Sequence, residues 1–180
     1  MQKTNKRMNL YYSPKAFLKE YALVKGYSTE VAWSMTVVPY KDGYKIDDVF
    51  VYPQEVYSYY VHVDINKWAM WKAELPDEVS DHLFGDGHSH VDISAFPSPF
   101  DMERRRREIE QKGKGYFLYQ ICNKQGETTF EFYDIDQGLI YDDDHINIKM
   151  ELGGETEEEF LSRVFDLISF GKDGNINEFE

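Results

Sequence analysis

The sequence predicts a single α/β domain, because helical and strand patterns follow one another in mixed order and nothing divides them. Apolar residues recur at helical spacing in some segments and alternate with polar residues in others. The chain has 180 residues, 42% of them hydrophobic and 16% aromatic, which is enough for one full core. We therefore expect one globular unit in which helices accompany a sheet.

The chain opens with a helix and a hairpin. Ser13 and Pro14 are typical of a helix start, and the helix is predicted over residues 14–25. Its expected apolar face is formed by Phe17, Leu18, Tyr21 and Val24. Alternating residues then predict strands over 29–38 and 44–52, joined by a turn at 41–43.

The middle of the chain continues the mixed order. A third strand is expected over 58–64, followed by a helix over 67–75. Trp68 and Trp71 share a face of that helix, which predicts that they pack into the core. The further elements are a strand over 82–90, a helix over 98–112 and strands over 116–123 and 128–134.

The acidic residues gather at the C-terminal end. Residues 141–180 contain twelve Asp or Glu and three Lys or Arg. The pattern that begins at Thr156 is a capping box, which predicts a helix over about 156–170. We therefore expect a main domain over residues 1–140 and an acidic extension over 141–180.

The charge, the hydropathy and the cysteine count limit which binding partners and which cellular compartment we expect for this protein. A net charge of -13 and a pI near 4.8 oppose attraction to nucleic acid or to anionic membranes. The sequence has neither an apolar run that could span a membrane nor a signal-peptide pattern. Cys122 is the single cysteine, so a metal site must use histidine and carboxylate ligands. These observations predict a soluble cytoplasmic protein.

Four residues form the candidate chemical site. His88 and His90 are two apart in a predicted strand, so both imidazoles point to the same face. Ser98 begins the next helix, and Asp101 falls in its first turn. Two histidines and one aspartate can hold zinc with a fourth position open for water, as in catalytic sites. Each fragment has a simpler interpretation, since His-x-His occurs on exposed strands and Ser98 with Asp101 is a helix cap.

The combined pattern resembles a known family. His88-Ser89-His90, seven residues, Ser98, two residues and Asp101 reproduce the signature of the JAMM metalloproteases, also called JAB or catalytic MPN domains. The resemblance covers roughly residues 14–135 and includes Glu30, near the start of the first strand. Val91, Trp33 and Gly87 depart from residues frequent in the family, and they favour a stand-alone prokaryotic or phage type.

The resemblance implies both a fold and a reaction. The fold would be the MPN type, a cytidine-deaminase-like mixed sheet flanked by helices. His88, His90 and Asp101 would bind one Zn²⁺ per chain, Glu30 would act as general base, and Ser98 would stabilise the oxyanion. The reaction would be peptide or isopeptide hydrolysis at an extended protein tail, for which ubiquitin-like tails are the family's precedent. For a phage protein, the compartment would be the host cytoplasm.

Two other functions compete with this one. A non-catalytic MPN-like scaffold for binding or assembly would keep the fold without cleaving anything, although such members usually lose metal ligands. A metal-dependent phosphoesterase also uses His-x-His at a strand end, but it needs more ligands than His145, the one histidine after Asp101. The substrate and the oligomeric state are open at this point.

Overall fold

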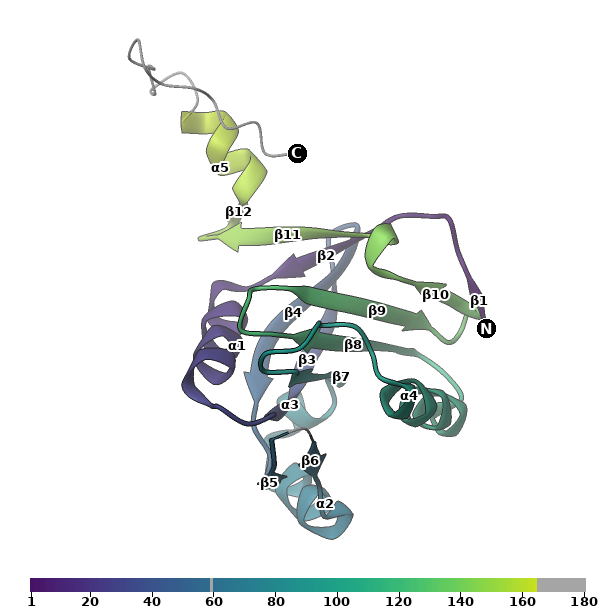
Figure 1. Cartoon of the computed structure of the whole chain (residues 1–180). Helices are drawn as coiled ribbons and strands as arrows, with labels where there is room; N and C mark the ends of the chain where they lie inside the picture. The colour runs from purple at the N-terminus through teal and green to yellow at the C-terminus, as the bar shows by residue number, and fades with distance from the viewer. Residues whose placement is uncertain (59, 165–180) are drawn as a thin grey trace.

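A curled mixed sheet forms the centre of the molecule in the computed structural model, which describes residues 1–58 and 60–164 (Figure 1). Ten of the described strands form it, in the order β1-β10-β9-β8-β7-β3-β4-β2-β11-β12. The strands are β1 Gln2–Lys3, β2 Met8–Tyr12, β3 Ala32–Tyr40, β4 Gly43–Phe50, β7 Leu83–Ser89, β8 Tyr116–Cys122, β9 Thr128–Asp134, β10 Leu139–Tyr141, β11 Ile146–Leu152 and β12 Glu155–Thr156. A separate two-stranded sheet pairs β5 Glu55–Val56 with β6 Val61–His62.

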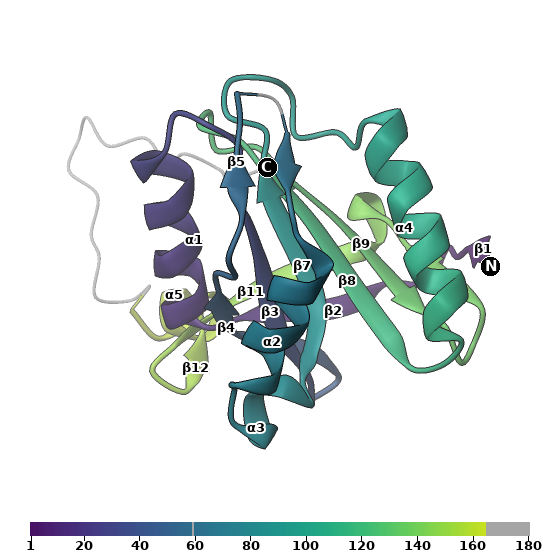
Figure 2. The same ribbon diagram turned by 90° about the horizontal axis from the view of Figure 1, so that it is seen from below.

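Helices flank the sheet on different sides. Figure 2 shows α1 and α4 at opposite flanks of the sheet, with α2 between them. The helices are α1 Pro14–Gly26, α2 Ile65–Ala73, α3 Asp77–Ser80, α4 Pro99–Lys112, α5 Glu157–Val164 and the short 3-10 helix η1 Asp143–His145. Among the described helices, none combines the length and the apolar character needed to cross a lipid bilayer.

The expected α/β class is therefore confirmed, and the central strands explain where a site can form. β3 pairs with β4 as an antiparallel hairpin, and β7 pairs with the other edge of β3. β7 and β8 are parallel and are connected through α4, so they form a β-α-β unit. In such units the carboxyl end of the first strand and the start of the helix meet at one edge of the sheet.

The sheet buries its two faces in different ways. The larger core gathers apolar and aromatic residues around Leu10, Trp33, Met35, Ile46 and Leu118. A smaller cluster beneath α4 consists of Ile109, Phe117 and Tyr119. Because side chains alternate along a strand, residues 86, 88 and 90 lie on one face, while Gly85 and Gly87 lie on the other.

The predicted start of α1 is confirmed, but its predicted buried face is wrong except at Val24. The Ser13 hydroxyl accepts a hydrogen bond from the Ala16 amide, as expected of an N-cap. The residues that α1 buries are Ala16, Glu20 and Val24. Phe17, Leu18 and Tyr21 are 46 to 62% exposed instead. The helix turns its small alanine to the sheet and uses Glu20 in a polar contact there, which hydrophobic spacing does not predict.

Three further expectations need correction. The strand expected over 58–64 reduces to β6, and position 59 of it lies outside the described residues. α2 buries none of its residues, so Trp68 and Trp71 are half-buried rather than core. Residues 141–152 were expected to belong to an appended segment, but β11 lies in the main sheet, parallel to β2. α5 ends at Val164, and the rest of the helix expected to 170 lies outside the described residues.

Candidate metal centre

The two histidines lie at the carboxyl end of β7. His88 is in the strand and His90 follows it directly, and the His90 amide still bonds the Cys122 carbonyl at 2.8 Å. Strand alternation therefore continues through both residues and points their rings to the face covered by α4. The ring centroids are 4.9 Å apart, and both side chains are at least nine-tenths buried.

Asp101 reaches the same place from the first turn of α4. The Ser98 hydroxyl accepts a hydrogen bond from the Asp101 amide, while the Asp101 carboxylate accepts one from the Ser98 amide, which is a complete capping box. The Ser98 hydroxyl also donates to Asp101 Oδ2 at 2.5 Å. The cap thus fixes one carboxylate oxygen and the direction of the side chain.

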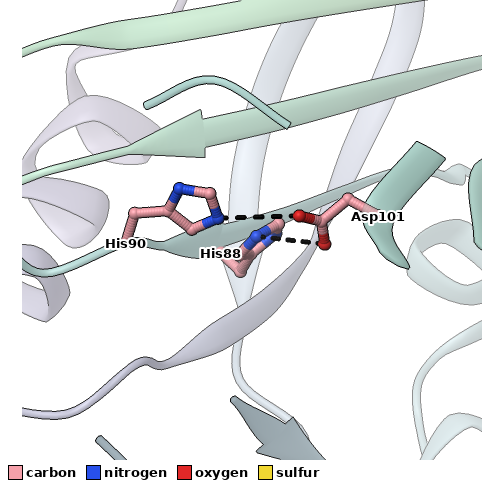
Figure 3. A group of neighbouring side chains, drawn as sticks. All are labelled: His88, His90 and Asp101. Atoms are coloured by element: carbon pink, nitrogen blue, oxygen red, sulfur yellow. Dashed lines mark ion pairs between the residues drawn. The ribbon is translucent and has the colours of Figure 1, made fainter. Parts of the chain in front are cut away.

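The three side chains converge at the spacing of metal ligands (Figure 3). His88 Nε2 lies 3.4 Å from Asp101 Oδ1, and His90 Nε2 lies 3.6 Å from Asp101 Oδ2. These separations are longer than ordinary hydrogen bonds, which measure about 2.7–3.2 Å. Two ligand atoms about 2.0–2.1 Å from a tetrahedral zinc ion lie about 3.3 Å apart. With all donor atoms within 4.8 Å of one another, the residues fit one small cation.

The protonation states also suit a metal. Burial lowers the pKa of His88 to about 3, so its ring is neutral and keeps a lone pair for coordination. His90 Nδ1 lies 2.8 Å from the Ser94 carbonyl, which can only accept, so that nitrogen carries a hydrogen and leaves Nε2 free. Burial opposes ionisation of Asp101, but contact with His90 and the hydrogen bonds from Ser98 hold its pKa well below its ordinary range.

The pKa of His90 is raised by its neighbours in this site. Burial acts to lower the pKa of His90, but the neighbouring Asp101 and the Ser94 carbonyl outweigh it and raise the pKa. In this site His90 therefore holds a proton more strongly than an ordinary histidine does. A cation must displace this proton in order to bind.

Glu30 lies near the cluster but outside it. It is buried, two residues before β3, and burial raises its pKa, while the charge of His90 lowers it. It does not belong to the group whose ligand atoms lie within 4.8 Å. Ser89, between the two histidines, holds this segment: its hydroxyl accepts from the Val31 amide at 3.0 Å, and its amide donates to the Val31 carbonyl at 2.9 Å.

The loop from β7 to α4 is held by contacts that the sequence did not predict. Val91 has a φ of 49°, in the left-handed region that costs a β-branched residue roughly 1–2 kcal/mol. Its carbonyl accepts a hydrogen bond from the Lys124 amide at 2.8 Å. The Asn123 amide side chain donates to the Ile93 carbonyl at 3.0 Å. The turn between β8 and β9 thus holds the loop that carries the Ser94 carbonyl.

The remaining histidines and the arginine run over residues 104–107 lie outside this cluster. His62 is exposed, and His145 pairs with Asp142 at 2.6 Å. His82 bonds the carbonyl of Glu78 and takes no part in the cluster. Each arginine from 104 to 107 pairs with an acidic side chain of the chain itself, namely Glu103, Glu108, Glu110 or Glu131.

Comparison with known proteins adds no relative. No protein-family model matches the chain, and no curated protein sequence matches it. The chemistry of the centre therefore rests on the residues and their geometry. These show a buried His-His-Asp group that can hold a metal ion.

Proposed function

We propose that this chain is a zinc-dependent peptidase or isopeptidase of the JAMM type. The observation that carries the proposal is the convergence of His88, His90 and Asp101 at ligand spacing in a buried site. Two imidazoles and one carboxylate are one of the ligand sets of catalytic zinc sites, in which the fourth position is left to water or substrate. Zinc bound there would polarise the scissile carbonyl and lower the pKa of a water toward neutrality.

Glu30 is the proposed general base. Its burial raises its pKa, so the carboxylate holds a proton more strongly than an exposed glutamate does. In hydrolysis it takes a proton from the attacking water and returns it to the leaving amine. Its place outside the ligand group supports this role over metal binding.

Ser98 is proposed to donate a hydrogen bond to the oxyanion. Its hydroxyl donates to Asp101 in this structure, so the role requires the hydroxyl to rotate while the helix cap is kept through the backbone amides. A hydroxyl beside the metal can supplement the charge that stabilises the tetrahedral intermediate.

Two departures from the family pattern compensate for each other, which supports the proposed MPN fold. Trp33 and Gly87 are directly paired between β3 and β7. A Cβ at Gly87 would lie 2.3 Å from Trp33 Nε1, so the indole fills the space over the glycine. The family frequently has glycine in the first position and an aromatic residue in the second. The exchange keeps one aromatic ring between the two strands.

Glu30→Gln tests the mechanism. The amide keeps the size of the side chain but accepts no proton, so zinc content should stay near one per chain while turnover falls by roughly 10²- to 10⁴-fold. A substrate is first found by screening ubiquitin-like fusions and extended C-terminal tails, with zinc measured by elemental analysis. Glu55→Gln, at an exposed position of β5, is the matched control.

The possible outcomes separate the alternatives. Wild-type turnover in Glu30→Gln contradicts the general-base role, and loss of zinc in that variant makes Glu30 a ligand. If zinc-loaded wild-type protein cleaves none of the tails, the non-catalytic binding scaffold becomes the better explanation.

A further inference from the structure

A cavity of about 440 Å³ lies beside the candidate metal centre and is lined by residues of α2, β7 and α4, among others. Asp86 at its floor precedes His88 by two residues on the same face of β7, which places them roughly 7 Å apart along the strand. Arg104 in its wall follows Asp101 by about one helical turn, a rise of roughly 4.5 Å. The cavity is therefore within one or two residues of the centre for an extended peptide.

Positive charge in this cavity exceeds negative charge. The lining contains Arg104, Lys72 and Lys112 against Asp86 and Glu108. Within the described part of the chain, neither lysine has an ion-pair partner; Lys72 lies over the ring of Trp68 and Lys112 over that of Phe117. The two ammonium groups come from different helices, and the pKa of Lys112 is lowered by burial and by the charge of Lys72.

Arg104 has hydrogen-bonding capacity to spare. Its Nε is buried without a hydrogen-bond partner, and the nearest carboxylate oxygen, on Glu108, is 3.6 Å away. The other oxygen of Glu108 accepts from the Tyr119 hydroxyl at 2.6 Å. A carboxylate entering the cavity could accept hydrogen bonds from this guanidinium, whose ion pair with Glu108 leaves the Nε–H without a hydrogen-bond partner.

The remaining lining fits a peptide rather than an inorganic anion. Tyr52, Trp68 and Phe117 supply aromatic walls, and the volume is in the range of pockets that enclose small organic ligands. Asp86 accepts a hydrogen bond from Ser34 at 2.9 Å and can also accept from a peptide amide. A peptide residue with an apolar side chain, a backbone amide and a carboxylate could contact the aromatic walls, Asp86 and the cationic side chains, respectively.

We propose that this cavity binds a carboxylate of the substrate one or two residues from the bond that is cut. Arg104 and the two lysines bind the carboxylate, and the aromatic walls bind the adjoining apolar group. The carboxylate has two possible sources, the C-terminus of the substrate or an acidic side chain. The distance between this carboxylate and the cleaved bond rests on the proposed peptidase function. The binding of a carboxylate in the cavity does not depend on that function.

Calorimetric titration of the full-length protein, zinc-loaded and after chelation, tests the site without requiring turnover. The probes are acetyl-Gly-Gly-Phe with a free C-terminus, the same peptide as its C-terminal amide, and acetyl-Gly-Glu-Phe amide. At least one carboxylate probe should bind about 10-fold more tightly than the neutral amide in both forms of the protein, the effect of one hydrogen bond to a charged group. Preference for the first probe identifies a terminal carboxylate, and preference for the third identifies an acidic side chain.

Arg104→Gln should remove most of this preference, and Lys72→Gln, on the half-buried side of α2, should reduce it. Arg106→Gln is the matched control, because Arg106 is exposed and pairs with Glu103 and Glu110. Equal affinity for the acid and amide probes overturns the proposal, as does an unchanged preference in a folded Arg104→Gln protein. If the protein cleaves peptides but shows no preference for the carboxylate probes, the carboxylate site is refuted and the peptidase function is not. If it prefers the carboxylate probes but cleaves no peptide, the peptidase function is refuted and the carboxylate site is not.

Discussion

Replacing the buried Glu20 with glutamine should stabilise the protein at neutral and alkaline pH. Glu20 faces the sheet from α1, where it accepts hydrogen bonds from the Tyr12 hydroxyl and from Gln120. Burial raises its pKa from about 4.5 to about 7, although both hydrogen bonds act to lower it. At about 1.36 kcal/mol per pH unit, the ionised side chain costs the folded state about 3 kcal/mol. Glutamine keeps an acceptor for the same donors and carries no charge.

The sign follows from proton linkage. Below pH 4.5 the carboxyl is protonated in both the folded and the unfolded chain, so its ionisation does not change the free energy of unfolding of the wild type relative to Glu20→Gln. As the pH rises toward 7 the unfolded chain ionises first, and the wild type loses stability relative to Glu20→Gln. Above pH 7 both states are ionised and the difference is constant. Between pH 5 and 8 the stability difference should grow by about 2 to 3 kcal/mol.

Urea unfolding of both proteins at several pH values measures this difference, because all other titrating groups are common to the two proteins. Glu74→Gln, at an exposed position after α2, should show a difference that does not change with pH. A flat curve for Glu20→Gln, or one that falls as the pH rises, would refute the assignment of Glu20 as a buried carboxyl of raised pKa.

Three further predictions concern the metal centre and its support. Elemental analysis should find about one zinc per chain, and His88→Ala should lose it while the exposed His62→Ala retains it; zinc unchanged in His88→Ala contradicts the ligand set. Ser89→Ala leaves the buried Val31 amide without its acceptor and should lower the free energy of unfolding by about 1–3 kcal/mol; urea midpoints equal to wild type would show that water replaces the hydroxyl. Gly87→Ala places a Cβ against Trp33 and should lower the free energy of unfolding by at least about 1–3 kcal/mol. Gly26→Ala meets no atom within 4 Å, so this control should leave the stability unchanged or raise it. Equal urea midpoints for the two variants would contradict the packing argument.

Local sequence was sufficient for the elements that carry the candidate metal ligands. A residue spacing of two in a strand directs His88 and His90 to one face, and Ser98-Pro99 starts a helix whose first turn contains Asp101. Both rules act within one element and need no distant contact. The two elements meet because β7 leads directly into α4, so the end of the strand and the start of the helix lie at one edge of the sheet, where the three side chains converge.

Local sequence failed where an element's environment is set by distant parts of the chain. The helical spacing in α1 predicted that Phe17, Leu18 and Tyr21 face the core, but the sheet meets Ala16 and Glu20 instead. β2 and β11 pair with each other across more than 130 residues, so neither segment alone reveals the pairing that places it in the main sheet.

The sequence alone determined the α/β class and the three candidate ligands, since strand alternation and helix capping are properties of neighbouring residues. Tertiary packing alone decided that Ser89 holds the segment beside Glu30 and that Asp86, Arg104 and Lys72 share one cavity. These residues come from separate elements, and their distances depend on how β7, α2 and α4 pack. The chemistry of a site can thus be encoded within a few neighbouring residues, whereas the surface that would select its substrate exists only after the elements have packed together.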